Sequence, residues 1–296
     1  MSESTATPSA RPHQRAEQLA AALPPLLVSA ERVAMTVAQG VHGRRRVGAG
    51  EAFWQFRRYH SGDPASTIDW RRSAKTERLY VRQTEWEAVQ SVWIWRDASP
   101  SMHYGSAAGD VAKIDRATLL ALALAVLLTR AGEHVALLGR DHQPRTGLVA
   151  LSRMAAALAG DELGPSLPPF ENLPRDARAV LIGDFLSPID EIERCLTYFA
   201  GIGVAGHLLE IRDPAEEQLP FAGRTCFEGL EAEGRITVGR VEKLRQTYLD
   251  RIGAHRAAVV TAASRLGWTV ATHCTDRPPE TALLALYAAL SKGSRR

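Results

Sequence analysis

From Ser91 to the end of the chain, short apolar segments alternate with longer amphipathic ones. The apolar segments have the length of buried strands, and the segments between them repeat apolar residues at helical spacing. The expected strands are Val92–Arg96, Val135–Leu138, Ala179–Ile182, Gly206–Ile211 and Thr269–His273, and the expected helices are Ile114–Ala131, Leu148–Ala159, Ile189–Ala200, Val241–Leu266 and Glu280–Leu290. This alternation favours a Rossmann-like α/β domain over residues 90–296, with a mainly parallel sheet covered by helices on both faces.

The remainder of the chain has a different texture. Between residues 216 and 239 the alternation is interrupted, and two β-prone segments around Glu233-Gly234 predict an inserted hairpin. Residues 15–89 form an N-terminal region, which begins with helical spacing broken at Pro24-Pro25 and continues as an Arg- and aromatic-rich stretch of β-structure and ordered loops. Residues 1–14, rich in Ser, Thr, Ala and Pro, are expected to be a disordered tail.

Composition limits the cellular setting. The net charge of +3 over 296 residues is too small for a protein that binds nucleic acid or membranes over its whole surface. The cysteines Cys195, Cys226 and Cys274 are odd in number and contain no C-x-x-C pair, which argues against disulfides and sulfur-ligated zinc. No uncharged apolar window reaches the roughly 18 residues of a membrane span. We therefore expect a cytoplasmic protein with no integral membrane segment.

Two carboxylates fall where expected strands of the α/β domain end. The first opens the run Asp97-Ala98-Ser99-Pro100-Ser101, and the second is Asp184. Ligands of parallel α/β sheets bind at this edge, and these side chains offer only oxygen atoms, as Mg²⁺ prefers. These oxygen ligands do not fill the coordination shell of the ion, so they would leave a coordination position for an acidic side chain of a partner. The alternative is that Asp97 and Ser99 cap the next helix, and that Asp184 caps the helix after Pro188.

A second set of residues carries a family resemblance. The runs are Arg57-Arg58-Tyr59-His60-Ser61-Gly62-Asp63, Ile68-Asp69-Trp70-Arg71-Arg72-Ser73-Ala74-Lys75 and Leu79-Tyr80-Val81-Arg82. Together they resemble the signature of the domain of unknown function 58 family. These are bacterial proteins with a von Willebrand factor A-like domain, commonly encoded beside MoxR-type AAA+ ATPases.

The resemblance gives the D-x-S-x-S run a specific meaning. In von Willebrand factor A domains such a run begins a metal-ion-dependent adhesion site, which implies Asp97, Ser99 and Ser101 as metal-site residues with Asp184 as the later aspartate. The site normally includes a loop threonine, for which Thr146 is the nearby candidate. The implied metal is Mg²⁺, with Mn²⁺ or Ca²⁺ as substitutes. Arg96 departs from the expected apolar residue and could pair with Asp97 or a nearby acid, which would weaken cation binding by about 1 kcal/mol or more.

Two stretches of biased charge allow further interpretations. Residues 43–82 hold ten Lys or Arg against four acids, with aromatics interleaved, a mixture suited to single-stranded nucleic acid. We favour the alternative that the arginines between Arg44 and Arg82 stack on Trp54, Tyr59 and Trp70 and order an irregular motif. Residues 210–233 hold seven acids against two arginines and form either a docking surface or a solvated hairpin.

These observations favour a non-enzymatic, metal-dependent protein-interaction module. By resemblance it would be an adaptor that works with a MoxR-type AAA+ ATPase in assembling or remodelling an unidentified client protein. The chain lacks a G-x-x-x-x-G-K-[ST] loop, so we do not expect it to be the ATPase. The alternatives are a Mg²⁺-dependent phosphohydrolase that uses Asp97 and Asp184, and a nucleic-acid binder that uses the Arg44–Arg82 block.

Overall fold

The computed structural model divides the chain into two compact units. One unit comprises Met1–Arg44 and Gln90–Arg296, and the other comprises Arg45–Val89. The structure describes residues 26–38, 53–59, 68–75, 78–84, 91–109, 111–160, 163–230 and 234–292. The expected tail of residues 1–14 and the helical spacing before Pro24 lie outside these ranges.

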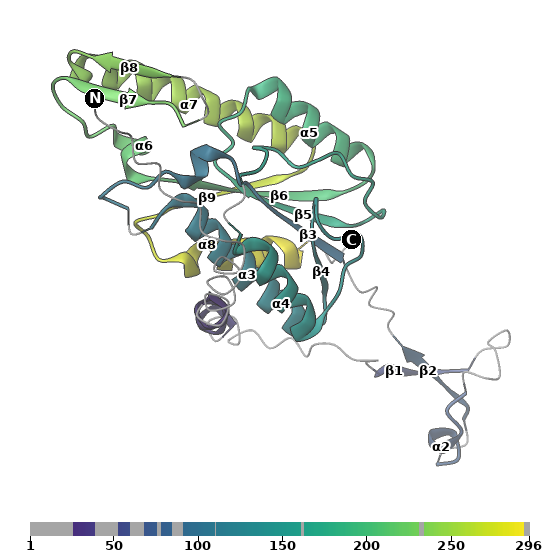
Figure 1. Ribbon diagram of the computed structural model, residues 1–296. Helices are drawn as coiled ribbons and strands as arrows, with labels where there is room; N and C mark the ends of the chain where they lie inside the picture. Colours follow the sequence, from purple (N-terminus) through teal and green to yellow (C-terminus); the bar gives the residue numbers. More distant parts are fainter. Residues whose placement is uncertain are drawn as a thin grey trace. The chain divides into compact units, whose positions relative to one another are not determined.

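The larger unit is built on a five-stranded parallel sheet, which confirms the mixed α/β architecture with a mainly parallel sheet (Figure 1). The strand order is β4-β3-β5-β6-β9, and each adjacent pair is parallel. The strands are β3 (Ser91–Arg96), β4 (His134–Leu137), β5 (Arg178–Gly183), β6 (Ala205–Arg212) and β9 (Thr269–Cys274). Each lies within one or two residues of its predicted bounds because its apolar run is bordered by polar or turn residues.

Helices cover both faces of this sheet, as Figure 1 shows. One face packs against α3 (Lys113–Arg130), α4 (Gly147–Leu158) and α8 (Pro279–Lys292), and a helix over residues 26–38 adds side chains to the same core. The other face packs against α5 (Ile189–Gly201) and α7 (Val241–Arg265). Strand side chains alternate between the two cores, so that Ile94 enters the first core while Trp93 and Trp95 enter the second.

The segment between β6 and α7 leaves the alternating pattern. It contains the short helix α6 (Pro214–Gln218) and an antiparallel hairpin of β7 (Thr225–Glu228) and β8 (Arg235–Val238). The α6 helix follows directly from the carboxyl end of β6. This segment therefore brings additional acidic residues to the edge of the sheet where Asp97 and Asp184 stand.

The smaller unit contains an antiparallel pair of strands, β1 (Phe53–Arg58) and β2 (Tyr80–Thr84), and one turn of helix, α2 (Trp70–Ser73). The backbone N–H of Tyr80 donates to the buried Ser73 hydroxyl at 2.9 Å, and that of Asp69 donates to the Tyr80 carbonyl at 2.8 Å. Part of the signature, residues 60–63, and part of the basic block, Arg44 to Arg46, lie outside the described residues. Both interpretations of the basic block, nucleic-acid binding and an irregular motif ordered by its arginines, therefore stay predictions.

Candidate metal centre

Two neighbouring strands bring the predicted carboxylates together. In the parallel pair of β3 and β5, Arg96 is in register with Ile182, and the N–H of Asp97 donates to the Ile182 carbonyl at 2.8 Å. Asp97 and Asp184 consequently follow adjacent strand ends. Gly183 permits this approach, because a Cβ atom there would lie 2.8 Å from the Cβ and 2.9 Å from Oδ2 of Asp97.

The two serines of the D-x-S-x-S run link these carboxylates. The backbone N–H of Ser99 donates to Asp97 Oδ1 at 2.8 Å, and the hydroxyls of Ser99 and Ser101 are 3.0 Å apart. Ser101 Oγ then donates to Asp184 Oδ2 at 2.7 Å. Asp97, Ser99 and Asp184 are buried and Ser101 is half-buried. The structure therefore brings four of the five predicted site residues into one hydrogen-bonded cluster.

Local capping accounts for only part of this arrangement. Ser99 is at the N-cap of the 3₁₀ helix η2 (Pro100–His103) but makes no side-chain capping bond, and the N-cap of α5 is Pro188 rather than Asp184. Each aspartate uses Oδ1 in a short turn, Asp97 with Ser99 N–H and Asp184 with Leu186 N–H at 3.2 Å. The Oδ2 atoms take no part in these turns, and that of Asp184 instead accepts from Ser101.

Asp97 Oδ2 is the unusual atom of the cluster. It is buried and has no hydrogen-bond partner among the described residues. Buried polar atoms are almost always paired, and an unpaired carboxylate oxygen is costly. Burial, together with the neighbouring Asp184 carboxylate, raises the pKa of Asp97 to about 7. Without a cation, this site therefore resists carrying both negative charges.

Lys113, the first residue of α3, is a member of the site that the sequence analysis missed. Its Nζ is 2.9 Å from Asp184 Oδ2 and 2.5 Å from Glu216 Oε1, and its side chain is fully buried. Burial alone would lower the pKa of Lys113, but the carboxylates of Asp184 and Glu216 outweigh that effect and the pKa is raised. The two carboxylates therefore favour the ammonium form of Lys113 inside the site.

Asp213 holds the surrounding loops to this ion pair. It is fully buried, and it caps α6 by accepting the N–H of Ala215 at 2.8 Å, while Glu216 Oε2 accepts the N–H of Asp213 at 3.1 Å. Its second oxygen accepts the N–H of Ser106, in the loop after η2, at 2.9 Å. Asp213 therefore ties the loop of the D-x-S-x-S run to the helix that carries Glu216.

Thr146 stands apart from the four clustered residues. It is exposed at the N-cap of α4, and the preceding Arg145 forms an isolated antiparallel bridge with Val135. Val135 pairs with Val92, near the amino end of β3, whereas Asp97 follows the carboxyl end of that strand. The structure does not bring Thr146 to the site, because the loop that carries it returns to the opposite edge of the sheet.

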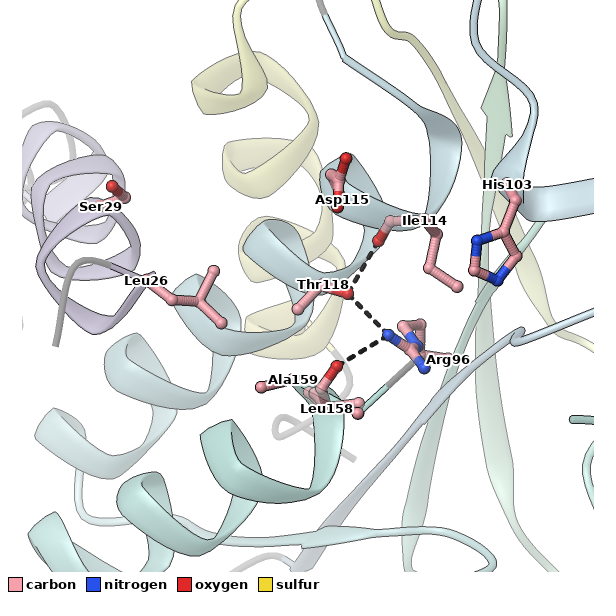
Figure 2. Close-up of a pocket in the computed structure, with 10 residues that line it drawn as sticks. Leu26, Ser29, Arg96, His103, Ile114, Asp115, Thr118, Leu158 and Ala159 are labelled. Carbon is pink, nitrogen blue, oxygen red and sulfur yellow. Dashed lines mark hydrogen bonds between the residues drawn. The ribbon is translucent and has the colours of Figure 1, made fainter. Parts of the chain in front are cut away.

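Arg96 also points elsewhere. Its guanidinium donates to Thr118 Oγ1 at 2.8 Å and to the Leu158 carbonyl at 3.0 Å, toward α3 and α4 (Figure 2). It lines a separate pocket of about 400 Å³, together with His103 and Asp115. The cation that contacts the site's carboxylates is therefore Lys113, where the sequence had suggested Arg96.

The residues present fit a hard divalent cation. The described residues contain no group of three or more His, Cys, Asp or Glu side chains arranged around a metal position, so hydroxyls would have to complete the ligand set. The cluster supplies them, because Ser99 and Ser101 stand between the two aspartates. All four side chains would bind a metal through oxygen, and Asp97 Oδ2 lacks a partner within the part of the chain that the structure describes, which is the chemistry that Mg²⁺ accepts.

The fold and site together define an α/β protein with a polar centre at the carboxyl edge of its sheet. Residues 55–258 match the family described as "Protein of unknown function DUF58", and the chain belongs to that family. Uncharacterized proteins from Mycobacterium bovis and Mycobacterium tuberculosis are each 28% identical to it over 279 residues, covering 88% of this chain and 86% of theirs. The resemblance to the domain of unknown function 58 family is confirmed by this match.

Solved structures with some likeness were also found. The conserved hypothetical protein BatB from Bacteroides thetaiotaomicron is 14% identical with a TM-score of 0.38, and an aerotolerance-related membrane protein from Bacteroides fragilis is 15% identical with a TM-score of 0.41. Each match covers 69% of this chain and 99% of the other. A membrane spanning protein from Vibrio fischeri is 14% identical with a TM-score of 0.16, covering 69% of this chain and 98% of that one.

These descriptions correct one expectation. The cytoplasmic location predicted from composition stands against the printed descriptions of two of these neighbours as membrane proteins, and we withdraw it. Composition reports the surface chemistry of a chain and carries no information on the compartment where that chain works. None of the helices in the described ranges combines the length and apolar character needed to cross a bilayer.

Proposed function

We propose that this chain is a non-enzymatic, metal-dependent protein-interaction module with a domain of the von Willebrand factor A type. In this proposal Asp97, Ser99, Ser101 and Asp184 hold Mg²⁺, and the metal accepts a carboxylate from a partner protein. The observation that carries the proposal is the buried Oδ2 of Asp97, which has no partner in the described ranges and lies beside the hydrogen-bonded pair of Ser101 and Asp184. A bound divalent cation would pair that oxygen and balance the two neighbouring carboxylates.

The surroundings of the cluster favour binding over hydrolysis. A metal-dependent phosphohydrolase needs a base or nucleophile within hydrogen-bond reach of the reacting group. Here the ionisable neighbours, Lys113 and Glu216, are already paired with each other. Among the described residues His103 makes no hydrogen bond to a carboxylate, and it lies on the separate pocket beside Arg96. When bound, Mg²⁺ would supply an open coordination position, and the residues would supply charge and orientation.

Membership of the family supports the kind of partner. Its members are commonly encoded beside MoxR-type AAA+ ATPases, so we propose that the chain is an adaptor between such an ATPase and a client protein. An acidic side chain on the ATPase or the client would complete the metal coordination. Because the partner's carboxylate would bind to a metal that this chain holds, the affinity of the complex would depend on both the carboxylate and the metal.

A pull-down with a MoxR-type ATPase from the same organism tests this function. We expect recovery of the ATPase in Mg²⁺, loss of recovery in EDTA, and weaker recovery with Ser99→Ala, which removes one hydroxyl from the cluster. Ser152→Ala is the matched control, because Ser152 is an exposed serine on α4. Recovery that is equal in Mg²⁺ and EDTA would contradict the metal-dependent interaction. Mg²⁺-dependent phosphatase activity that disappears with Asp97→Ala would contradict the interaction proposal and favour the phosphohydrolase hypothesis.

A further inference from the structure

We propose that Lys113 is a built-in competitor of the divalent cation. Its ammonium balances Asp184 when the site is free of metal, and its charge sets how tightly a cation binds. This inference rests on the proposed function, since it concerns the same site. It adds a residue that controls the site without being one of its metal ligands.

The competition follows from a shared oxygen. Asp184 Oδ2 accepts hydrogen bonds from both Ser101 Oγ, at 2.7 Å, and Lys113 Nζ, at 2.9 Å. A cation held by Asp97, Ser101 and Asp184 would have to approach that same carboxylate. Two positive ions that share one carboxylate in a buried site repel each other strongly, because little water lies between them to screen the charge.

Charge in the site explains why both cations can be accommodated. Asp97, Asp184 and Glu216 offer three negative charges when ionised, against the single positive charge of Lys113. A divalent cation would complete the balance. When it binds Asp184, the Lys113 ammonium still has Glu216 as a partner at 2.5 Å, so it is not left unpaired in the interior.

Glu216 is therefore the second residue through which this ion pair would set cation affinity. Its Oε1 accepts from Lys113 while its Oε2 accepts the N–H of Asp213 at the start of α6. Replacing Glu216 with Gln keeps the shape and an acceptor for that N–H but removes a charge. Lys113 would then depend on Asp184 alone and hold it more firmly. The competitor model thus predicts opposite effects for Lys113→Met and Glu216→Gln.

Calorimetric titration of Mn²⁺ into the full-length chain measures both effects. Lys113→Met keeps an unbranched side chain and removes the charge, so we expect the dissociation constant for Mn²⁺ to fall about tenfold or more. For Glu216→Gln we expect it to rise by a similar factor, roughly tenfold. Lys243→Met, at an exposed lysine on α7, is the matched control and should leave the constant within about twofold of wild type.

Thermal unfolding supplies a readout that does not depend on calorimetric heat. Lys113→Met leaves the buried carboxylates without their ammonium, so it should unfold at lower temperature than wild type in EDTA and gain more than wild type from Mn²⁺. If Lys113→Met does not fold, Glu216→Gln carries the test. Weakened Mn²⁺ binding by Glu216→Gln supports the proposal, and unchanged or tighter binding overturns it.

The outcomes separate this inference from the proposed function. Equal Mn²⁺ affinity in wild type and Lys113→Met would overturn the competitor role and leave the metal site standing. Weaker binding by both Lys113→Met and Glu216→Gln would show that the ion pair only maintains structure, and would also overturn it. Binding by Lys113→Met but not by wild type would support the competitor role and contradict metal dependence in the natural chain. Absence of binding in every variant would contradict both.

Discussion

Buried charge is accommodated differently at the two ends of the parallel strands: the amino edge of the sheet, where the strands begin, and the carboxyl edge, where they end. At the amino edge, Arg178 donates to the carbonyl of Leu290 in α8, and His207 Nδ1 lies 2.7 Å from Thr269 Oγ1. Burial, with a contribution from Arg178, lowers the pKa of His207 to about 4, so this histidine stays neutral. At the carboxyl edge, Asp97, Lys113 and Asp184 are buried as a cluster, and Asp97 Oδ2 has no partner in the described part of the chain.

This difference separates stability from function within one sheet. At the amino edge His207 is neutral and Arg178 is paired with a carbonyl of the protein itself, as expected where burial of charge only has to be tolerated. The carboxyl edge keeps carboxylates close together at a cost that packing alone does not explain. Arrangements of this kind cluster at functional sites. We therefore expect substitutions at the amino edge to change stability alone and substitutions at the carboxyl edge to change cation binding as well.

The largest expected effect comes from Gly206→Ala near the amino end of β6. A Cβ atom at this position would lie 2.0 Å from the indole ring of buried Trp268, so the ring or the strand must move. We expect a loss of about 3 kcal/mol in the free energy of unfolding, measured with urea. Gly201→Ala in α5 is the control, because an added Cβ there meets no atom of the other described segments within 4 Å, and it should be neutral or slightly stabilising. Equal stability of the two variants would contradict this packing.

Gly183→Ala tests the carboxyl edge by the same chemical change. The new methyl group would meet the Asp97 side chain at 2.8 Å, so Asp97 must leave its place beside Asp184. We expect a loss of about 1–3 kcal/mol in unfolding free energy, together with loss of Mg²⁺ binding by calorimetry. Gly206→Ala, to the extent that it folds, should keep Mg²⁺ binding. Cation binding that survives in Gly183→Ala would remove Asp97 from the site.

The pH dependence of stability sharpens the same contrast. Because the pKa of Asp97 rises from 3.8 to about 7 on folding, the folded chain holds this proton more tightly than the unfolded chain. Its stabilising contribution is complete below pH 3.8 and is lost as pH rises through about 7, with a slope of at most about 1.4 kcal/mol per pH unit. In EDTA, urea unfolding of Asp97→Asn should lack this slope, and Mg²⁺ should suppress it in wild type. Parallel pH profiles for wild type and Asp97→Asn would contradict the raised pKa.

The smallest effect is expected far from both edges, on the β7–β8 hairpin. Arg235 and Glu228 form an ion pair at 2.8 Å, but their side chains are 70% and 61% exposed. Exposed pairs of this kind contribute little because water and salt screen them, so Arg235→Ala should change unfolding free energy by less than about 0.5 kcal/mol. It should leave Mg²⁺ binding unchanged. A larger loss of stability or binding would show that the hairpin belongs to the site.

Features of the molecule that are local in sequence could be predicted. The helix predicted over Ile114–Ala131 is α3 (Lys113–Arg130), because its apolar spacing is a property of the segment itself. Asp97 and Asp184 were found for a related reason. Both follow apolar strands directly, and the carboxyl ends of parallel strands share one edge, so their proximity follows from the fold class.

The partners that arrive from elsewhere could not be predicted. Lys113 and Glu216 are 103 positions apart, and they meet because α6 turns back over the carboxyl edge after β6. No spacing rule marks that contact, and a lysine in the first turn of a helix carries no signal of burial. Thr146 failed for the converse reason, since a family pattern supplied the residue type while the loop takes it to the opposite edge. Arg96, adjacent in sequence to Asp97, faces the α3–α4 side because successive residues of a strand alternate.

The most direct measurement for the whole account is a calorimetric titration of Mg²⁺ into wild type and Asp97→Ala. Asp97 Oδ2, which no described residue pairs, is proposed to hold a cation at the carboxyl edge. We therefore expect saturable binding of a single Mg²⁺ by wild type, and no binding heat from an Asp97→Ala variant whose circular dichroism shows that it is folded. Equal heats from the two proteins would contradict the claim and reduce the D-x-S-x-S run to a structural turn.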